Sequence, residues 1–382
     1  MKSYFSIFNK FAIENLVLIL CAMFLAFAII SCDSKSNDDD SGGDNPNPTA
    51  SPAPTSTPTP TPLPIPSPSP APGGSIIEPG GTLSMVPETF DYVGNGNERQ
   101  MLDFYEITGL PSQTASEISS RGLIVGRPAL VFFHGGAWVL GDRGDVDPLI
   151  FEAAEMAGFH VVSVGYRLAT EAAWPAQIHD ANAAVRWIKQ NSAELGVDPD
   201  KLIVVGGSAG AHLGAAVAVA SNIAELQGPH NTELPTSTDV ALAVLIFGAY
   251  NLNMIVDDGL DLLDDGTCSV EDLGPGLAAV LLLLDCPPSF NLLDPLENCS
   301  QNDLDSASPE IFVDSTDPPS YLAHGRDDCT VPFQQTVGMA MALDGAGVPF
   351  ESMIFEGGVH NTDSLNLSVD DIIDFIDENV AP

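Results

Sequence analysis

The chain has 382 residues, and its 52 acidic residues far outnumber its 12 lysines and arginines, which gives a formal net charge of −40 at pH 7. Such an excess of negative charge argues against binding to nucleic acid or to an anionic membrane surface through basic patches. Residues 83–382 follow a proline-rich segment and are numerous enough to bury a large core as one domain.

The N-terminal segment, residues 1–31, resembles a bacterial lipoprotein signal peptide. Lys2 and Lys10 precede an apolar run over residues 16–30, which is shorter than the roughly 20 residues of a membrane span. The run ends in Ile-Ser-Cys, and the resemblance implies that Cys32 is acylated and becomes the new N-terminus. We therefore expect a lipid anchor in a bacterial cell envelope, facing the periplasm or the surface. An ordinary cleaved signal and an uncleaved anchor are the alternatives.

Residues 32–82 are predicted to form a tether. Three aspartates at positions 38–40 precede a run rich in Pro, Ser and Thr, in which every second residue from Pro58 to Pro72 is proline. Proline lacks a backbone N–H and favours polyproline II, so this run cannot build a helix or the interior of a sheet. We expect the tether to give the following domain reach.

Residues 83–382 alternate short apolar strands with helical patterns. Residues 89–108 are expected to open the domain as an antiparallel pair. Further strands are predicted at residues 129–133, 160–164, 202–205, 241–247, 320–323 and 350–355. Helical faces are formed by Ile178, Ala181, Val185 and Ile188, and at the end by Val369, Ile372, Ile373, Ile376 and Val380. This alternation predicts an α/β fold with a mostly parallel central sheet and helices on both faces.

The strand predicted at residues 129–133 runs into the glycine-rich turn His134-Gly135-Gly136-Ala137-Trp138. Gly135 and Gly136 have no side chains, so their N–H groups can turn toward a negative charge that develops on a bound reactant. We expect His134 to hold the loop and Trp138 to pack or to line a pocket.

The strand predicted at residues 202–205 is followed by the pattern Gly-x-Ser-x-Gly at residues 206–210, and small residues then predict a helix up to Ala220. Between a strand and a helix, this pattern is typical of a sharp, strained turn that exposes the serine Oγ. Cβ atoms at its two outer glycines would clash where strand and helix pass closely. We predict Ser208 as a nucleophile and the N–H of Ala209 as a third oxyanion donor, beside those of the two upstream glycines.

Two later turns offer a carboxylate and an imidazole that could activate the serine. The strand predicted at residues 320–323 leads into a match to His-Gly-x-x-Asp-x-x-Val-Pro. This spacing favours Asp328 as the acid, with Asp327 as the alternative. His360 lies on a Gly-Gly-x-His turn near the C-terminus and is the expected base.

Together these motifs resemble those of the α/β-hydrolase superfamily, and within it the carboxylesterases related to hormone-sensitive lipase and the feruloyl- and acetyl-xylan-type bacterial esterases. The resemblance covers roughly residues 85–382 and includes Tyr166-Arg167-Leu168, Trp174-Pro175-Ala176 and Asp180. Many relatives of hormone-sensitive lipase have a third glycine where Ala137 stands, and an aspartate where Gly207 stands. With glycine at position 207, the turn around Ser208 is closer to that of the feruloyl-esterase-like and kynurenine-formamidase-like branches.

The resemblance implies a serine carboxylesterase that acts on small or short-chain acyl esters, including acyl groups linked to polysaccharide. It implies two-step acyl transfer by Ser208, His360 and Asp328 through an acyl-enzyme, without a cofactor or metal. The alternatives are an amidase, peptidase or formamidase on the same triad, and a catalytically silent surface binding protein with this fold.

Residues 251–316 interrupt the alternation and are long, acidic and rich in leucine. Insertions at this point of the superfamily commonly form a cap, so we expect a cap or lid, with a disordered surface insert as the alternative. The acidic stretch 261–272 fails as a calcium loop because Leu263 falls at a position where a ligand should be.

Four cysteines remain after the signal, an even number in a chain that is expected to be exported. We predict two disulfides, with three possible pairings, among Cys268, Cys286, Cys299 and Cys329. A bridge to Cys329 would tie the predicted cap to the turn that carries Asp328, and reduction should then impair activity.

Overall fold

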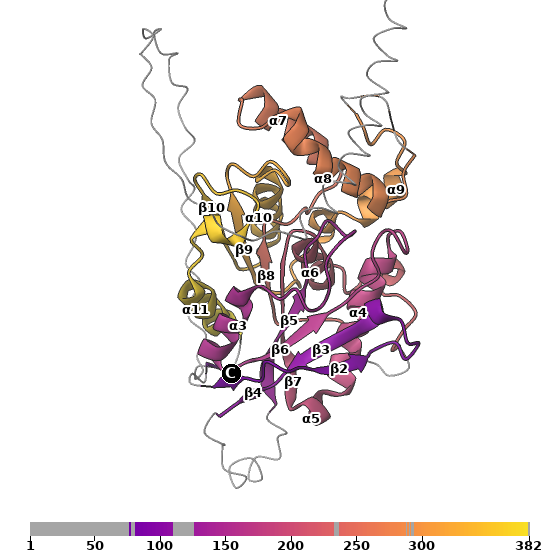
Figure 1. Cartoon of the computed structure of the whole chain (residues 1–382). Coiled ribbons are helices and arrows are strands. Elements are labelled where there is room, and N and C mark those ends of the chain that lie inside the picture. The colour runs from indigo at the N-terminus through magenta and orange to yellow at the C-terminus, as the bar shows by residue number, and fades with distance from the viewer. Residues whose placement is uncertain are drawn as a thin grey trace, which may run out of the picture. The chain divides into compact units, whose positions relative to one another are not determined.

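An eight-stranded sheet forms the centre of the computed structural model (Figure 1). Its strand order is β10-β9-β8-β7-β5-β6-β3-β2; the six strands from β10 to β6 are parallel, and β3 and β2 continue the sheet antiparallel. The predicted fold class and strands are confirmed. The strands are β2 (Glu88–Asp91), β3 (Met101–Tyr105), β5 (Arg127–Phe133), β6 (His160–Val164), β7 (Val197–Gly207), β8 (Leu242–Ile246), β9 (Ser320–Gly325) and β10 (Phe350–Phe355).

The structure describes residues 76–77, 81–109, 126–232, 237–287, 289, 291 and 294–380. The predicted signal peptide, Cys32 and most of the predicted tether lie outside these residues. Ile76 is buried and donates its N–H to Asp377, and Thr82 lies in the short strand β1 (Thr82–Leu83), which pairs with β4 (Ile107–Thr108). Structured residues therefore begin before the domain boundary that we placed at residue 83.

Both faces of the sheet are covered by helices because the side chains of its central strands alternate and all are buried. In β7, Leu202 and Val204 join the core on one face, and Ile203 and Val205 join the core on the other. The first face packs against α4 (Ala176–Gln190), α6 (Ala209–Val219) and α10 (Gln334–Ala346), and the second against α3 (Pro148–Ala157) and α11 (Val369–Asn379).

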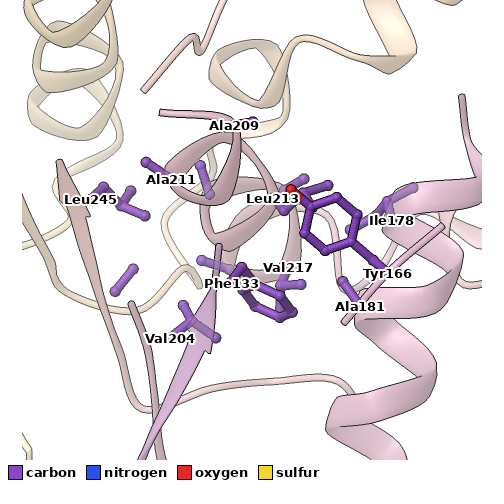
Figure 2. Packing of buried hydrophobic residues seen from close by; sticks show 14 of the residues in the cluster. Phe133, Tyr166, Ile178, Ala181, Val204, Ala209, Ala211, Leu213, Val217 and Leu245 are labelled. Atoms are coloured by element: carbon purple, nitrogen blue, oxygen red, sulfur yellow. The ribbon is translucent and has the colours of Figure 1, made fainter. Parts of the chain in front are cut away.

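Helix α6 packs closely on the sheet because its residues are small. Figure 2 shows Ala209, Ala211, Leu213 and Val217 of this helix beside Phe133, Val204 and Leu245 of three parallel strands. Ile178 and Ala181 of α4 pack beside the same cluster, on the helical face that the sequence predicted. The helix that begins one residue after Ser208 is thus held firmly at the centre of the core.

The described part of the insertion at residues 251–316 is helical. It contains α7 (Ile255–Asp264), α8 (Val270–Leu283), α9 (Gln301–Ser306) and the 3-10 turn η3 (Pro309–Phe312). In Figure 1 the three helices lie above α6 and α10. Within the described residues no helix combines the length and the hydropathy that crossing a membrane requires.

The base of the insertion is joined to α10 by the side chain of Gln335. Its Oε1 accepts the N–H groups of Tyr250 and Asn251, and its Nε2 donates to Asp258 Oδ2 at 2.6 Å. Burial raises the pKa of Asp258 from the usual 3.8 to about 6, and the negative charge of Glu310 adds to this shift. The folded state therefore holds a proton on Asp258 more tightly than the unfolded chain does.

We expect the substitution Asp258→Asn to stabilise the protein above pH 6 and not at pH 4. A carboxyl with a raised folded-state pKa contributes stability below the unfolded pKa, and this is lost as the pH rises through about 6. Asparagine keeps the acceptor for Gln335 without the charge, so the melting temperature at pH 8 should rise by about 2–4 °C, allowing for solvent screening. The exposed neighbour Asp257 serves as the control, since Asp257→Asn should change the melting temperature at pH 8 by less than about 1 °C. An equal gain at pH 4 and pH 8 would contradict this account.

Candidate active site

Ser208 occupies the turn between β7 and α6 in a strained backbone conformation, with φ 56° and ψ −124°. A Cβ at Gly206 would lie 2.4 Å from the carbonyl carbon of Gly210, and a Cβ at Gly210 would lie 2.0 Å from the oxygen of Phe133. Side chains are excluded at both positions, as the sequence predicted. The packing of strand and helix thus forces the sharp turn that carries the serine.

The structure brings Ser208, His360 and Asp328 into one chain of hydrogen bonds. The Ser208 Oγ lies 2.8 Å from His360 Nε2, and His360 Nδ1 lies 2.6 Å from Asp328 Oδ2. Asp328 and His360 follow β9 and β10, so all three residues lie at the carboxyl ends of parallel strands. A carboxylate can only accept, so Nδ1–H donates to Asp328 and leaves Nε2 free to accept the serine proton.

Asp328 is fully buried, and its two oxygens have separate partners. Oδ1 accepts the N–H groups of Thr330 and Val331, at 2.9 and 3.0 Å, and Oδ2 faces His360. Burial alone would raise the pKa of Asp328, but the hydrogen bonds to His324 and His360 outweigh it and hold this pKa well below its usual range. Asp328 is therefore a carboxylate at neutral pH. The alternative acid, Asp327, is exposed and lies outside the hydrogen-bonded chain.

His324 is a second imidazole at this carboxylate, which the sequence analysis did not identify as a site residue. Its Nε2 lies 3.2 Å from Asp328 Oδ2 and 2.9 Å from the carbonyl oxygen of Val331, so Nε2–H donates to both. Its Nδ1 accepts from Thr336 Oγ1 at 2.7 Å. The signal was present in the His-Gly-x-x-Asp pattern, whose spacing of four residues places the histidine beside the aspartate.

Two of the three predicted oxyanion donors, Gly135 and Ala209, lie next to Ser208, and Gly136 follows Gly135 in the chain. A Cβ on Gly135 would come within 3.7 Å of the Ser208 Cβ, and Gly136 has a φ of 107°, which L side chains rarely adopt. Within the part of the chain that the structure describes, neither glycine N–H has a hydrogen-bond acceptor. Ala209 is the first residue of α6, where a helix leaves its N–H groups unpaired. The geometry leaves these donors available to a negative charge near Ser208.

Two buried histidines shape the loop that carries these glycines. His134 stacks on Tyr166, with ring centroids 4.2 Å apart, and Tyr166 donates to the carbonyl oxygen of His134. His212, which the sequence analysis did not single out, accepts from Trp138 Nε1 and donates from Nε2 to the carbonyl oxygen of Ala307. Burial lowers the pKa of His212 to about 4, so it is neutral at pH 7. These contacts link the glycine-rich loop to α6 and to the insertion.

Two disulfides join the four cysteines, as predicted, and the structure selects one of the three pairings. Cys268 pairs with Cys329, and Cys286 pairs with Cys299. Cys268 lies between α7 and α8, and Cys329 directly follows Asp328. The first disulfide therefore ties the insertion to the turn that carries the buried carboxylate.

We expect loss of the Cys268–Cys329 disulfide to lower both stability and kcat. The double substitution Cys268→Ser/Cys329→Ser should cost about 2–4 kcal/mol of unfolding free energy. It should also lower kcat about threefold to tenfold, because the turn at Asp328 loosens. The matched control is Cys286→Ser/Cys299→Ser, which opens the other disulfide and should leave kcat within about twofold. Equal kcat values in the two double variants, measured well below their melting temperatures, would contradict the link to Asp328.

Comparisons with known proteins relate part of the chain to esterases. The family model BD-FAE matches residues 124–267. The esterase LipQ of Mycobacterium tuberculosis (strain ATCC 25618 / H37Rv) is 30% identical over 246 residues, which are 63% of this chain and 52% of LipQ. The chain thus spans about half the length of the curated relatives it matches.

Solved structures show the same fold. A truncated carbohydrate esterase from gut microbiota aligns with a TM-score of 0.56 and 22% identity, over 78% of this chain and 99% of that one. A thermophilic esterase from Thermogutta terrifontis, solved with butyrate bound, aligns with a TM-score of 0.53 and 25% identity, over 77% of this chain and 93% of that one.

Proposed function

We propose that this chain is a serine carboxylesterase of the α/β-hydrolase superfamily that hydrolyses small or short-chain acyl esters. The observation that carries the proposal is the hydrogen bond of 2.8 Å from the Ser208 Oγ to His360 Nε2, made on a strained turn. A serine hydroxyl is a weak nucleophile until a positioned base accepts its proton. The names of the esterases that this chain matches support an ester as the substrate.

In the first half of the reaction, Ser208 Oγ attacks the ester carbonyl carbon while His360 Nε2 takes its proton. The carbonyl oxygen becomes an oxyanion, which accepts the N–H groups of Gly135, Gly136 and Ala209. Asp328 stabilises the imidazolium that forms on His360. The tetrahedral intermediate then collapses, the bond to the alcohol oxygen breaks, and His360 gives its proton to the leaving alcohol.

In the second half, water hydrolyses the acyl-enzyme. His360 Nε2 takes a proton from a water molecule, whose oxygen attacks the acyl carbon, and the same three N–H groups hold the new oxyanion. Cleavage of the bond to Ser208 Oγ releases the carboxylic acid, and His360 returns the proton to the serine. Atoms and charge balance over the cycle without a cofactor.

The proposal includes a class of substrate and a cellular location. The name of the gut carbohydrate esterase that shares this fold supports carbohydrate-linked acyl groups, including those on polysaccharide, as one class of substrate for this chain. The signal pattern that ends at Cys32 and the proline-rich tether favour a lipid-anchored enzyme in a cell envelope, reaching outward.

The test is hydrolysis of p-nitrophenyl acetate, butyrate and decanoate by the wild-type chain and by Ser208→Ala. We expect turnover of the short esters, with a loss on the order of 10⁴-fold or more in the variant. The chain-length profile would then show how large an acyl group the site accepts. A folded wild-type chain that hydrolyses none of these esters would overturn the esterase proposal, and amide and formanilide substrates would be tested next.

A further inference from the structure

Phe247, the residue that follows β8, lies beside the imidazole of His360. The two ring centroids are 4.6 Å apart, and the ring planes are tilted by 51°. Phe247 is only 7% exposed. Among the residues that the structure describes, Phe247 is the one aromatic side chain whose ring contacts the His360 imidazole. A large apolar side chain therefore lies against the imidazole at the candidate active site.

The backbone of Phe247 is held in an unfavourable conformation to place the ring there. Its φ is 41°, in the left-handed region that a bulky L residue rarely adopts. Its N–H donates to the carbonyl oxygen of Ala323 in β9, at 2.7 Å. Strain of this kind persists only where surrounding contacts enforce it, and it concentrates at functional sites.

Gly207, directly before Ser208, leaves the space that the ring of Phe247 fills. A Cβ at Gly207 would lie 3.1 Å from Phe247 Cε2 and 3.3 Å from Cζ. The φ of Gly207 is not left-handed, so its backbone does not demand glycine. Instead, the absence of a side chain at Gly207 leaves room for the ring of Phe247.

His360 needs such packing because its own segment offers little. Its neighbours Val359 and Asn361 are exposed, and its own side chain is 20% exposed. Hydrogen bonds hold the two nitrogens of the imidazole, at Ser208 and at Asp328. These bonds fix the ends of the ring but leave its flat sides to neighbouring side chains and water.

We propose that Phe247 is a positioning residue that holds His360 in line between Ser208 and Asp328, and that Gly207 is glycine in order to admit it. This inference rests on the proposed function of His360 as the general base. The phenyl ring limits rotation of the imidazole and keeps water from one side of its hydrogen bonds. A base that is displaced by a fraction of an ångström accepts the serine proton less readily.

The first test is Phe247→Leu in the full chain, with p-nitrophenyl acetate as substrate. We expect kcat to fall about tenfold while KM stays within about twofold, because the ring acts on the base and not on substrate binding. Phe104→Leu is the matched control. Phe104 lies against another imidazole, that of His160, with centroids 5.0 Å apart, away from the triad. This control should keep kcat within about twofold.

The second test is a double-mutant cycle with Gly207→Ala. The added methyl group should push on the ring and lower kcat about threefold to tenfold in the wild-type background. In the Phe247→Leu background it should cause little further loss. Full additivity of the two changes would show that Gly207 and Phe247 act independently, and would overturn the matched pair.

A third measurement separates this inference from the proposed function. The proton shared by His360 Nδ1 and Asp328 is expected to give a downfield ¹H NMR signal, which His360→Gln would identify. Phe247→Leu should broaden or remove this signal by admitting water, and Phe104→Leu should leave it unchanged. If Phe247→Leu loses the signal but the wild-type chain hydrolyses no ester, the esterase proposal is contradicted and the positioning role of Phe247 is not. A sharp signal and unchanged kcat in Phe247→Leu would overturn the positioning role.

Discussion

Replacement of Asp328 by asparagine is expected to lower kcat by about 10⁴-fold while the protein stays folded. Oδ1 of this residue accepts two backbone N–H groups, from Thr330 and Val331, which can only donate. The oxygen of an asparagine would keep these bonds, so its NH₂ group would face His360. His360 would then have to accept at Nδ1 and carry its proton on Nε2. In that tautomer it cannot take the proton of Ser208.

The neighbouring Asp327 provides a matched control for this prediction. It is one residue away, has the same charge and is exposed outside the hydrogen-bonded chain. Asp327→Asn should keep kcat within about twofold. Circular dichroism and thermal melting would establish that both variants are folded. If Asp328→Asn retained more than about a tenth of the wild-type kcat, the role of Asp328 in setting the tautomer would be wrong.

Replacement of Asp180 by alanine is expected to be the most destabilising of the substitutions proposed. Asp180 is fully buried and pairs with the guanidinium of Arg167 through two bonds of 2.8 Å. It also accepts the backbone N–H of Arg167 and Nε2 of Gln100. Alanine would leave a partly buried cation and a buried amide without their acceptor, which costs about 3–5 kcal/mol. For a domain of this size we expect a fall in the melting temperature of about 10 °C.

The control is a carboxylate that is more exposed than Asp180 and forms a longer ion pair. Asp198 lies 3.8 Å from Lys201, and the two side chains are 21% and 20% exposed. Pairs of this kind contribute less than about 1 kcal/mol, so Asp198→Ala should barely change the urea midpoint. Similar losses in Asp198→Ala and Asp180→Ala would show that the buried network around Arg167 adds nothing special to stability.

Local sequence patterns were sufficient to locate the strands and the reactive turns. Residues 160–164 and 350–355 are predicted with the bounds that the structure has, because short apolar runs between turn residues have few alternatives in a buried sheet. The glycines at 206 and 210 and the spacing around Asp328 were also informative. Each of these signals depends on neighbours close along the chain, where geometry is set by covalent connection and local sterics.

Packing in three dimensions determined which distant side chains come into contact. Phe247 reaches His360, His212 reaches Ala307, and Cys268 pairs with Cys329, across separations that no local pattern specifies. These meetings follow from the order and register of β7 to β10 and from how the insertion folds back over α6 and α10. Contacts of this kind are set by the packing of the whole core. Motifs in the sequence identify the groups that can react, and packing of the core determines which of these groups lie within reach of one another.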